Sequence, residues 1–187
     1  MKKVIFIGGV LASGKSTYSM ILKEKFKLNV INKDRLKEIL GDTIYVENRA
    51  DNLKLSIISF NLIKYLLVVN EGTIVFESNF KYYELDELKE LCKKLNYDVL
   101  SIVFDGTNEI LHERFMTRLN ENRHYVHKSQ DLSNIDDFIK VQDDLRRTKY
   151  FGKIIKVNCD DFSYQEDNKL FEEIEEFINW QKIYILV

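Results

Sequence analysis

Apolar and polar residues alternate in blocks along the chain, and the block lengths predict strands and helices in turn. The first apolar block, Val4–Ile7, has no polar residue between its members, which is typical of a strand buried on both faces of a parallel sheet. Further apolar runs of strand length follow at 28–32, 73–79, 97–106 and 153–159. Patterns with helical spacing occupy the other segments, at 16–27, 34–40, 51–70, 85–95, 109–119, 133–147 and from 170 onward.

This alternation predicts an α/β fold in which parallel strands are joined by right-handed helical crossovers. The length suits one domain, 1–187, with a single large core. The 51–70 segment is apolar over most of its circumference, so we expect that helix to be well covered. We also expect Gly41 to end the preceding helix. Ser133, with Asp136 three positions later, resembles a capping box that opens another.

The segment GGVLASGKST, Gly8–Thr17, follows the first predicted strand directly. It matches the pattern G-x-x-x-x-G-K-[ST] and precedes a predicted helix, which is the context of a phosphate-binding loop. Its glycines let successive N–H groups point at an anion, and the helix start adds its positive end. The lysine reaches the outer phosphates and the serine hydroxyl can ligate Mg²⁺. We therefore predict that ATP and Mg²⁺ are bound by Gly9, Ala12, Ser13, Gly14, Lys15, Ser16 and Thr17.

The same first residues also resemble a secretion signal, because Lys2 and Lys3 precede an apolar stretch. Removing such a segment would delete the first predicted strand, so we expect a cytoplasmic protein. No run approaches the roughly 20 apolar residues of a membrane helix, and we expect no membrane partner.

Charge and cysteine content add two further expectations. The net charge of −2 gives no general attraction to nucleic acid, which disfavours a long nucleic acid as partner without excluding it. Cys92 and Cys159, the only cysteines, are expected to be reduced and mostly buried.

Guanine-binding proteins would carry an N-K-x-D motif after a late strand. Here Asn32-Lys33-Asp34 is followed by Arg35 and comes after the second predicted strand, so the motif is not matched. The chain instead offers a carboxylate after strand two, another after strand three, and an arginine-rich segment after strand four.

With these features, the sequence resembles P-loop kinases of the predicted bacterial AAA-type ATPase/kinase group, which are related to polynucleotide kinase, zeta toxin, gluconate kinase and shikimate kinase. The matching pieces are GGVLASGKST, VINKDRLKEIL, GTIVFESNF and HERFMTRLNENRH. The resemblance implies a three-layer P-loop NTPase fold, with a five-stranded parallel sheet in the order 2-3-1-4-5 and a lid at about 119–133. Related sequences commonly read R-H-P-G-H where this chain has Arg123–His127, which is a departure from the pattern.

Two acidic residues and one basic residue are the candidate acceptor-site residues. For Asp34, the resemblance implies that it orients the acceptor hydroxyl and takes its proton; the alternative is an aspartate favoured by the helix dipole. Lys37 lies one helical turn after Asp34. We expect it either to hold an anionic part of the acceptor or to be a solvated lysine on the helix surface. Glu77 resembles the acidic residue that closes a Walker B strand, binding Mg²⁺ or the acceptor; the alternative is a merely exposed strand end.

Arginines near the end of the 109–119 helix are the candidate charge-stabilising groups. Arg118 and Arg123 are expected to act from the lid, because phosphoryl transfer spreads negative charge that positioned arginines stabilise. Arg114 can equally pair with an acidic neighbour. His124 and His127 have no neighbouring cysteine or carboxylate cluster that would complete a metal site.

The sequence therefore predicts an ATP-dependent phosphotransferase that moves the γ-phosphate of ATP to a hydroxyl of a small-molecule or nucleotide-type acceptor. The alternative is an ATP-binding or ATP-hydrolysing switch protein without an acceptor. The acceptor and the oligomeric state are not specified by the sequence.

Overall fold

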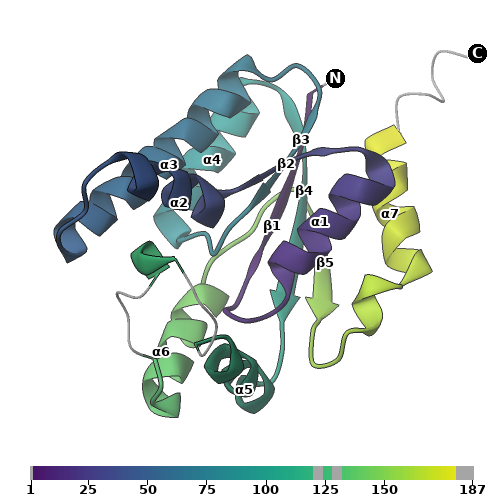
Figure 1. The fold of residues 1–187 in the computed structure, drawn as a ribbon. Helices are drawn as coiled ribbons and strands as arrows, with labels where there is room; N and C mark the ends of the chain where they lie inside the picture. The colour runs from purple at the N-terminus through teal and green to yellow at the C-terminus, as the bar shows by residue number, and fades with distance from the viewer. Residues whose placement is uncertain (1, 120–123, 128–131, 180–187) are drawn as a thin grey trace, which may run out of the picture.

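The sheet of this protein has five strands, all parallel, in the order β2-β3-β1-β4-β5 (Figure 1). The computed structural model describes residues 2–119, 124–127 and 132–179. The strands are β1 (Lys2–Gly9), β2 (Asn29–Asn32), β3 (Thr73–Glu77), β4 (Tyr97–Asp105) and β5 (Lys153–Asn158). The predicted fold class and strand order are both confirmed.

Helices cover both faces of the sheet, with α1 and α7 on one side and α3 and α4 on the other (Figure 1). The helices are α1 (Lys15–Phe26), α2 (Lys33–Thr43), α3 (Arg49–Val69), α4 (Tyr82–Lys94), α5 (Asn108–Leu119), α6 (Ile135–Arg146) and α7 (Asn168–Asn179), with 3₁₀ turns η1 (Tyr125–His127) and η2 (Ser163–Gln165).

The central strand β1 explains why the first apolar block has no alternation. Ile5 and Ile7 pack into the core on the α1 and α7 side, whereas Val4 and Phe6 pack into the core on the α3 and α4 side. All four are completely buried. The carboxyl end of β1 therefore emerges in the middle of the sheet, between the ends of β3 and β4.

Two expected helix boundaries are wrong. Helix α2 continues through Gly41 to Thr43, because Gly41 has another role: a Cβ there would lie 2.7 Å from Cγ1 of Val126, so the glycine makes room for η1. Helix α6 is capped by Asn134 and not by Ser133, since the Asn134 side chain accepts hydrogen bonds from the backbone N–H groups of Asp136 and Asp137.

The expectation that the long apolar helix is well covered is also wrong. One side of α3 packs on the sheet through Phe60, Ile63 and Leu67, but its outer side leaves large apolar residues exposed. By length and composition alone, α3 would pass for a membrane-crossing helix. The two cysteines match their prediction, because both are free and buried.

Candidate active site

The predicted phosphate-binding loop connects β1 to α1, and its backbone needs glycine at two positions. Gly9 has a φ of 120°, and a Cβ there would lie 2.0 Å from the carbonyl oxygen of Phe104. Gly14, the N-cap of α1, has a φ of 81°. Both values lie in the region that favours glycine. The loop therefore turns sharply enough to start α1 at Lys15.

Two side chains that are distant in sequence hold the loop in place. Gln142 is completely buried; its Oε1 accepts a hydrogen bond from the Leu11 N–H at 2.8 Å, and its Nε2 donates to the Leu11 carbonyl at 3.2 Å. The hydroxyl of Tyr150 accepts a hydrogen bond from the Gly9 N–H at 2.8 Å. The loop is thus fixed from α6 and from the segment that follows it.

Lys15 is folded back onto its own loop. Its Nζ donates to the Ser13 hydroxyl at 2.9 Å and to the Val10 carbonyl oxygen. Burial is the main cause that lowers the pKa of Lys15 to about 8, while Glu77 and Asp34 oppose the shift. An anion entering the loop would replace these carbonyl and hydroxyl partners and favour the charged ammonium.

The end of β3 places a buried carboxylate beside the first turn of α1. Glu77 is only 5% exposed, and its Oε2 accepts hydrogen bonds from the Ser16 hydroxyl at 3.1 Å and from the Asn32 amide. Burial raises the pKa of Glu77 to about 7, with Asp34 adding to the shift and Lys15 opposing it. A carboxyl group with this pKa gains from a nearby cation that favours its charged form.

The Ser16 hydroxyl and the Glu77 carboxylate are oxygen ligands of the kind that fit a magnesium ion. Mg²⁺ prefers hard oxygen ligands and is commonly held by one or two protein groups together with water and substrate phosphates. Ser16 and Glu77 supply a hydroxyl and a carboxylate already in contact with each other. Within 2–119, 124–127 and 132–179, no group of three or more histidine, cysteine or acidic residues forms a metal cluster. A cation beside Ser16 and Glu77 would therefore need the phosphate oxygens of the nucleotide as further ligands.

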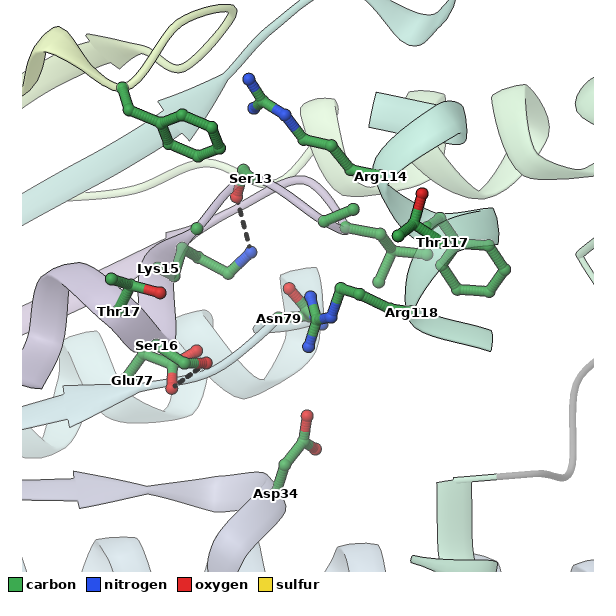
Figure 2. Close-up of a pocket in the computed structure, with 15 residues that line it drawn as sticks. Ser13, Lys15, Ser16, Thr17, Asp34, Glu77, Asn79, Arg114, Thr117 and Arg118 are labelled. Carbon is green, nitrogen blue, oxygen red and sulfur yellow. Dashed lines mark hydrogen bonds between the residues drawn. The ribbon is translucent and has the colours of Figure 1, made fainter. Parts of the chain in front are cut away.

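One cavity of about 440 Å³ connects the loop to the predicted acceptor side. Its lining includes Lys15, Ser16, Glu77, Asp34 and Arg118, which Figure 2 shows around a common space. Ala12, Ser13, Gly14 and Thr17 also line it. Asp34 is exposed at the start of α2, and Arg118 projects from the last turn of α5. Of the two predicted lid arginines, Arg123 lies outside the described residues.

A second cavity, of about 700 Å³, shares Ser16, Asp34 and Arg118 with the first and extends along α2. The described part of the predicted lid borders it. His124 Nε2 lies 2.9 Å from Asp42 Oδ1, and His127 Nε2 lies 3.1 Å from Glu38 Oε1. These contacts attach η1 to α2 above the second cavity.

Lys37 lies outside the lining of both cavities. Its half-buried ammonium is 3.4 Å from the Val126 carbonyl oxygen, which also accepts a hydrogen bond from Asn52 at 2.9 Å. Burial is the main cause that lowers the pKa of Lys37. In this arrangement, Lys37 contacts the backbone of η1.

The structure adds residues at the far end of the first cavity that the motifs did not single out. Phe162 is 55% exposed there, and the guanidinium of Arg114 lies 4.3 Å from the centroid of its ring. Arg114 also donates to the carbonyl oxygens of Cys159 and Asp160, so its partners are carbonyls and not the acidic side chain considered from the sequence. Phe162 lies a few residues after the fifth strand. This position was the only feature of the sequence that could have indicated a place in the cavity.

A comparison with protein-family models finds no match, and a search of curated proteins finds none either. Among solved structures, the chain is similar to a kinase candidate from Chloroflexus aurantiacus J-10-fl, with a TM-score of 0.76 and 19% identity over 94% of this chain and 97% of that chain. It is also similar to a gluconokinase from Sinorhizobium meliloti 1021, with a TM-score of 0.60 and 15% identity over 98% and 96% of the two chains. A shikimate kinase from Bacteroides thetaiotaomicron gives a TM-score of 0.60 and 15% identity over 95% and 96%.

At these identities the similarity establishes the fold. The chain therefore has the fold of these solved kinases, with a five-stranded parallel sheet in the order β2-β3-β1-β4-β5.

Proposed function

We propose that the protein is an ATP-dependent phosphotransferase that moves the γ-phosphate of ATP to a hydroxyl group of a small-molecule or nucleotide-type acceptor. One observation carries the proposal: a single cavity is lined by Lys15 of the phosphate-binding loop and by the carboxylates of Asp34 and Glu77. A protein that only bound nucleotide would not need an exposed carboxylate facing the phosphate loop.

The nucleotide end of the cavity has a group for each part of ATP. The loop N–H groups and Lys15 hold the phosphates, with the Lys15 ammonium exchanging its carbonyl partner for phosphate oxygens. Phe162 and Arg114 offer an exposed ring and a guanidinium plane to the adenine. Ser16 and Glu77 would hold Mg²⁺, which would neutralise developing charge on the transferred phosphoryl group.

At the acceptor end, Asp34 accepts the hydroxyl hydrogen bond and takes the proton as the acceptor oxygen attacks the γ-phosphorus. The bond between the γ-phosphorus and the β,γ-bridging oxygen breaks, and ADP leaves. The exposure of Asp34 and its place in both cavities support its role in taking the proton. Arg118 borders the same space and stabilises the negative charge that spreads over the phosphoryl oxygens. Arg123 is proposed as a second such arginine from the lid, and Lys37 as the group that positions the lid or an anionic part of the acceptor.

The proposal is tested by measuring ADP release with a panel of sugars, nucleosides, hydroxy acids and 5′-hydroxyl oligonucleotides. An acceptor that stimulates ADP release and is itself phosphorylated supports the proposal. Nucleotide binding without stimulation by any acceptor chemistry, and without a phosphorylated product, would favour the switch alternative.

Once an acceptor is found, Asp34→Asn separates catalysis from binding. We expect acceptor-stimulated turnover to fall by about 10²–10⁴, while the affinity for ATP changes little because Asp34 lies beyond the phosphate loop. Asp86→Asn, an exposed aspartate on α4, is the matched control and keeps full activity. Intact turnover in Asp34→Asn would show that the base is another group.

A further inference from the structure

The outer side of α3 carries a largely apolar stripe, interrupted by the exposed Lys54 and Asn61, which we call the α3 stripe. It extends over four turns and runs from Leu53 to Val69. Seven of its side chains are exposed by between 37% and 63%: Leu53, Ile57, Ile58, Leu62, Tyr65, Val68 and Val69. Apart from the adjacent pairs Ile57/Ile58 and Val68/Val69, these positions recur at spacings of three or four residues, so they fall on one half of the helix circumference.

An exposed surface of this kind is unusual on a monomer. The seven side chains together leave roughly 600 Å² exposed, at the upper end of the largest apolar patches on monomeric proteins. The opposite side of the helix is already occupied, because Phe60, Ile63 and Leu67 are buried in the core against the sheet. The stripe thus remains available for a second surface.

We propose that the α3 stripe is the interface of a symmetric homodimer, in which α3 of one protomer packs antiparallel on α3 of its partner. The centre of the stripe is Asn61, halfway between its ends at Leu53 and Val69. A two-fold axis through this position places Leu53 opposite the partner's Val69, and Ile57 opposite the partner's Tyr65. These two pairs are apolar, so this part of the stripe is complementary to itself, as an isologous interface requires.

The position of Asn61 favours a second copy of this chain as the surface that covers the stripe, over lipid or a wholly apolar partner. It is exposed at the middle of the stripe, where any apolar covering would leave its amide without hydrogen bonds, which is unfavourable. A carboxamide has both a donor and an acceptor. On a two-fold axis, the two Asn61 amides can therefore satisfy each other.

Charge favours the same arrangement. Lys54, which pairs with Asp51, is 71% exposed near one end of the stripe, and Glu71, which pairs with Lys2, is 80% exposed just beyond the other. In the antiparallel pair, Lys54 lies opposite the partner's Val68, about one helical turn from the partner's Glu71. The opposed helix dipoles add a favourable term. The protein as a whole has a net charge of −2, so it has no overall positive charge of the kind that draws peripheral helices to anionic membranes.

The size of the stripe is also sufficient. Two copies would cover roughly 1,200 Å² of apolar surface, which reaches the range of stable protein–protein interfaces before flanking residues are counted.

The first test is the mass of the full chain in solution, measured by sedimentation velocity as a function of concentration. We expect a dimer for the parent protein at about 50 µM, with dissociation on dilution. Tyr65→Glu should weaken the dimer by at least roughly tenfold, because it places a charge in the apolar stripe. Tyr82→Glu, an equally exposed tyrosine on α4 (68%), is the control and remains dimeric. A parent protein that is monomeric at this concentration would overturn the proposal.

The second test fixes the geometry by disulfide cross-linking. Asn61→Cys lies on the axis and should give a covalent dimer on mild oxidation. Leu53→Cys alone should not, because its symmetry mate is roughly 24 Å away along the helices, whereas Leu53→Cys combined with Val69→Cys should. The native Cys92 and Cys159 are at most 1% exposed and give little background. Equal cross-linking of Leu53→Cys and Asn61→Cys contradicts the antiparallel pairing. So does binding of the parent chain to phosphatidylcholine vesicles through the stripe in place of dimerisation.

Discussion

The substitution Glu77→Gln tests the electrostatics of the site through stability. Burial is the largest cause that raises the pKa of Glu77 from 4.5 to about 7. A carboxyl group with a raised pKa stabilises the fold below its unfolded pKa of 4.5, and this contribution is lost as the pH rises through 7. The shift corresponds to about 3 kcal/mol as an upper value, with little solvent screening because Glu77 is 5% exposed.

Glutamine has nearly the same shape and no charge at any of these pH values. Without nucleotide, the free energy of unfolding of Glu77→Gln should therefore match that of the parent near pH 4.5 and exceed it by about 1–3 kcal/mol at pH 8. Urea denaturation at a series of pH values measures the difference, with Glu90→Gln, an exposed glutamate on α4, as control. The reasoning is refuted if Glu77→Gln is less stable than the parent at pH 8. With MgADP bound, the parent should have a higher free energy of unfolding than Glu77→Gln, because the variant lacks the carboxylate proposed to hold the metal.

Three further substitutions test other parts of the site. Gln142→Leu removes both hydrogen bonds to Leu11, so urea denaturation should show a loss of about 2–3 kcal/mol; an unchanged midpoint would mean that the loop is not held from α6. Gly41→Val places methyl groups where Val126 already lies, so it should loosen the contact between η1 and α2. Limited proteolysis should therefore cut near η1 faster than in the parent. Equal cutting rates would contradict the docking of η1 on α2. Phe162→Ala should weaken ATP binding about fivefold, in line with a lost aromatic contact of about 1 kcal/mol, without affecting the binding of inorganic triphosphate. Calorimetry of both ligands checks this, and equal losses would count against an adenine contact.

The sequence predicted the sheet and the loop because their determinants are local. The unbroken apolar run at Val4–Ile7 indicates a central strand, and the spacing of Gly9, Gly14 and Lys15 requires the turn found between β1 and α1. Asp34 and Glu77 could be placed near the loop for the same reason, since the carboxyl ends of parallel strands share one edge.

Contacts between distant segments were beyond this kind of inference. Gln142 and Tyr150 hold a loop more than 130 residues earlier in the chain, and nothing in their own neighbourhood indicates that partner. Gly41 looks like a helix end in sequence, because its reason for being glycine is the approach of Val126 from the predicted lid. The apolar circumference of the 51–70 segment could not show which side would be covered, because both sides carry large apolar residues.

The central claim is that the amides of the loop and Lys15 hold the phosphates of ATP next to the two carboxylates. The most direct test is calorimetric titration of the parent and of Lys15→Met with ATP in the presence of magnesium. The account predicts binding to the parent and an affinity at least roughly tenfold weaker in the variant, because a buried ammonium no longer pairs with the phosphates. An unchanged affinity in Lys15→Met would contradict it.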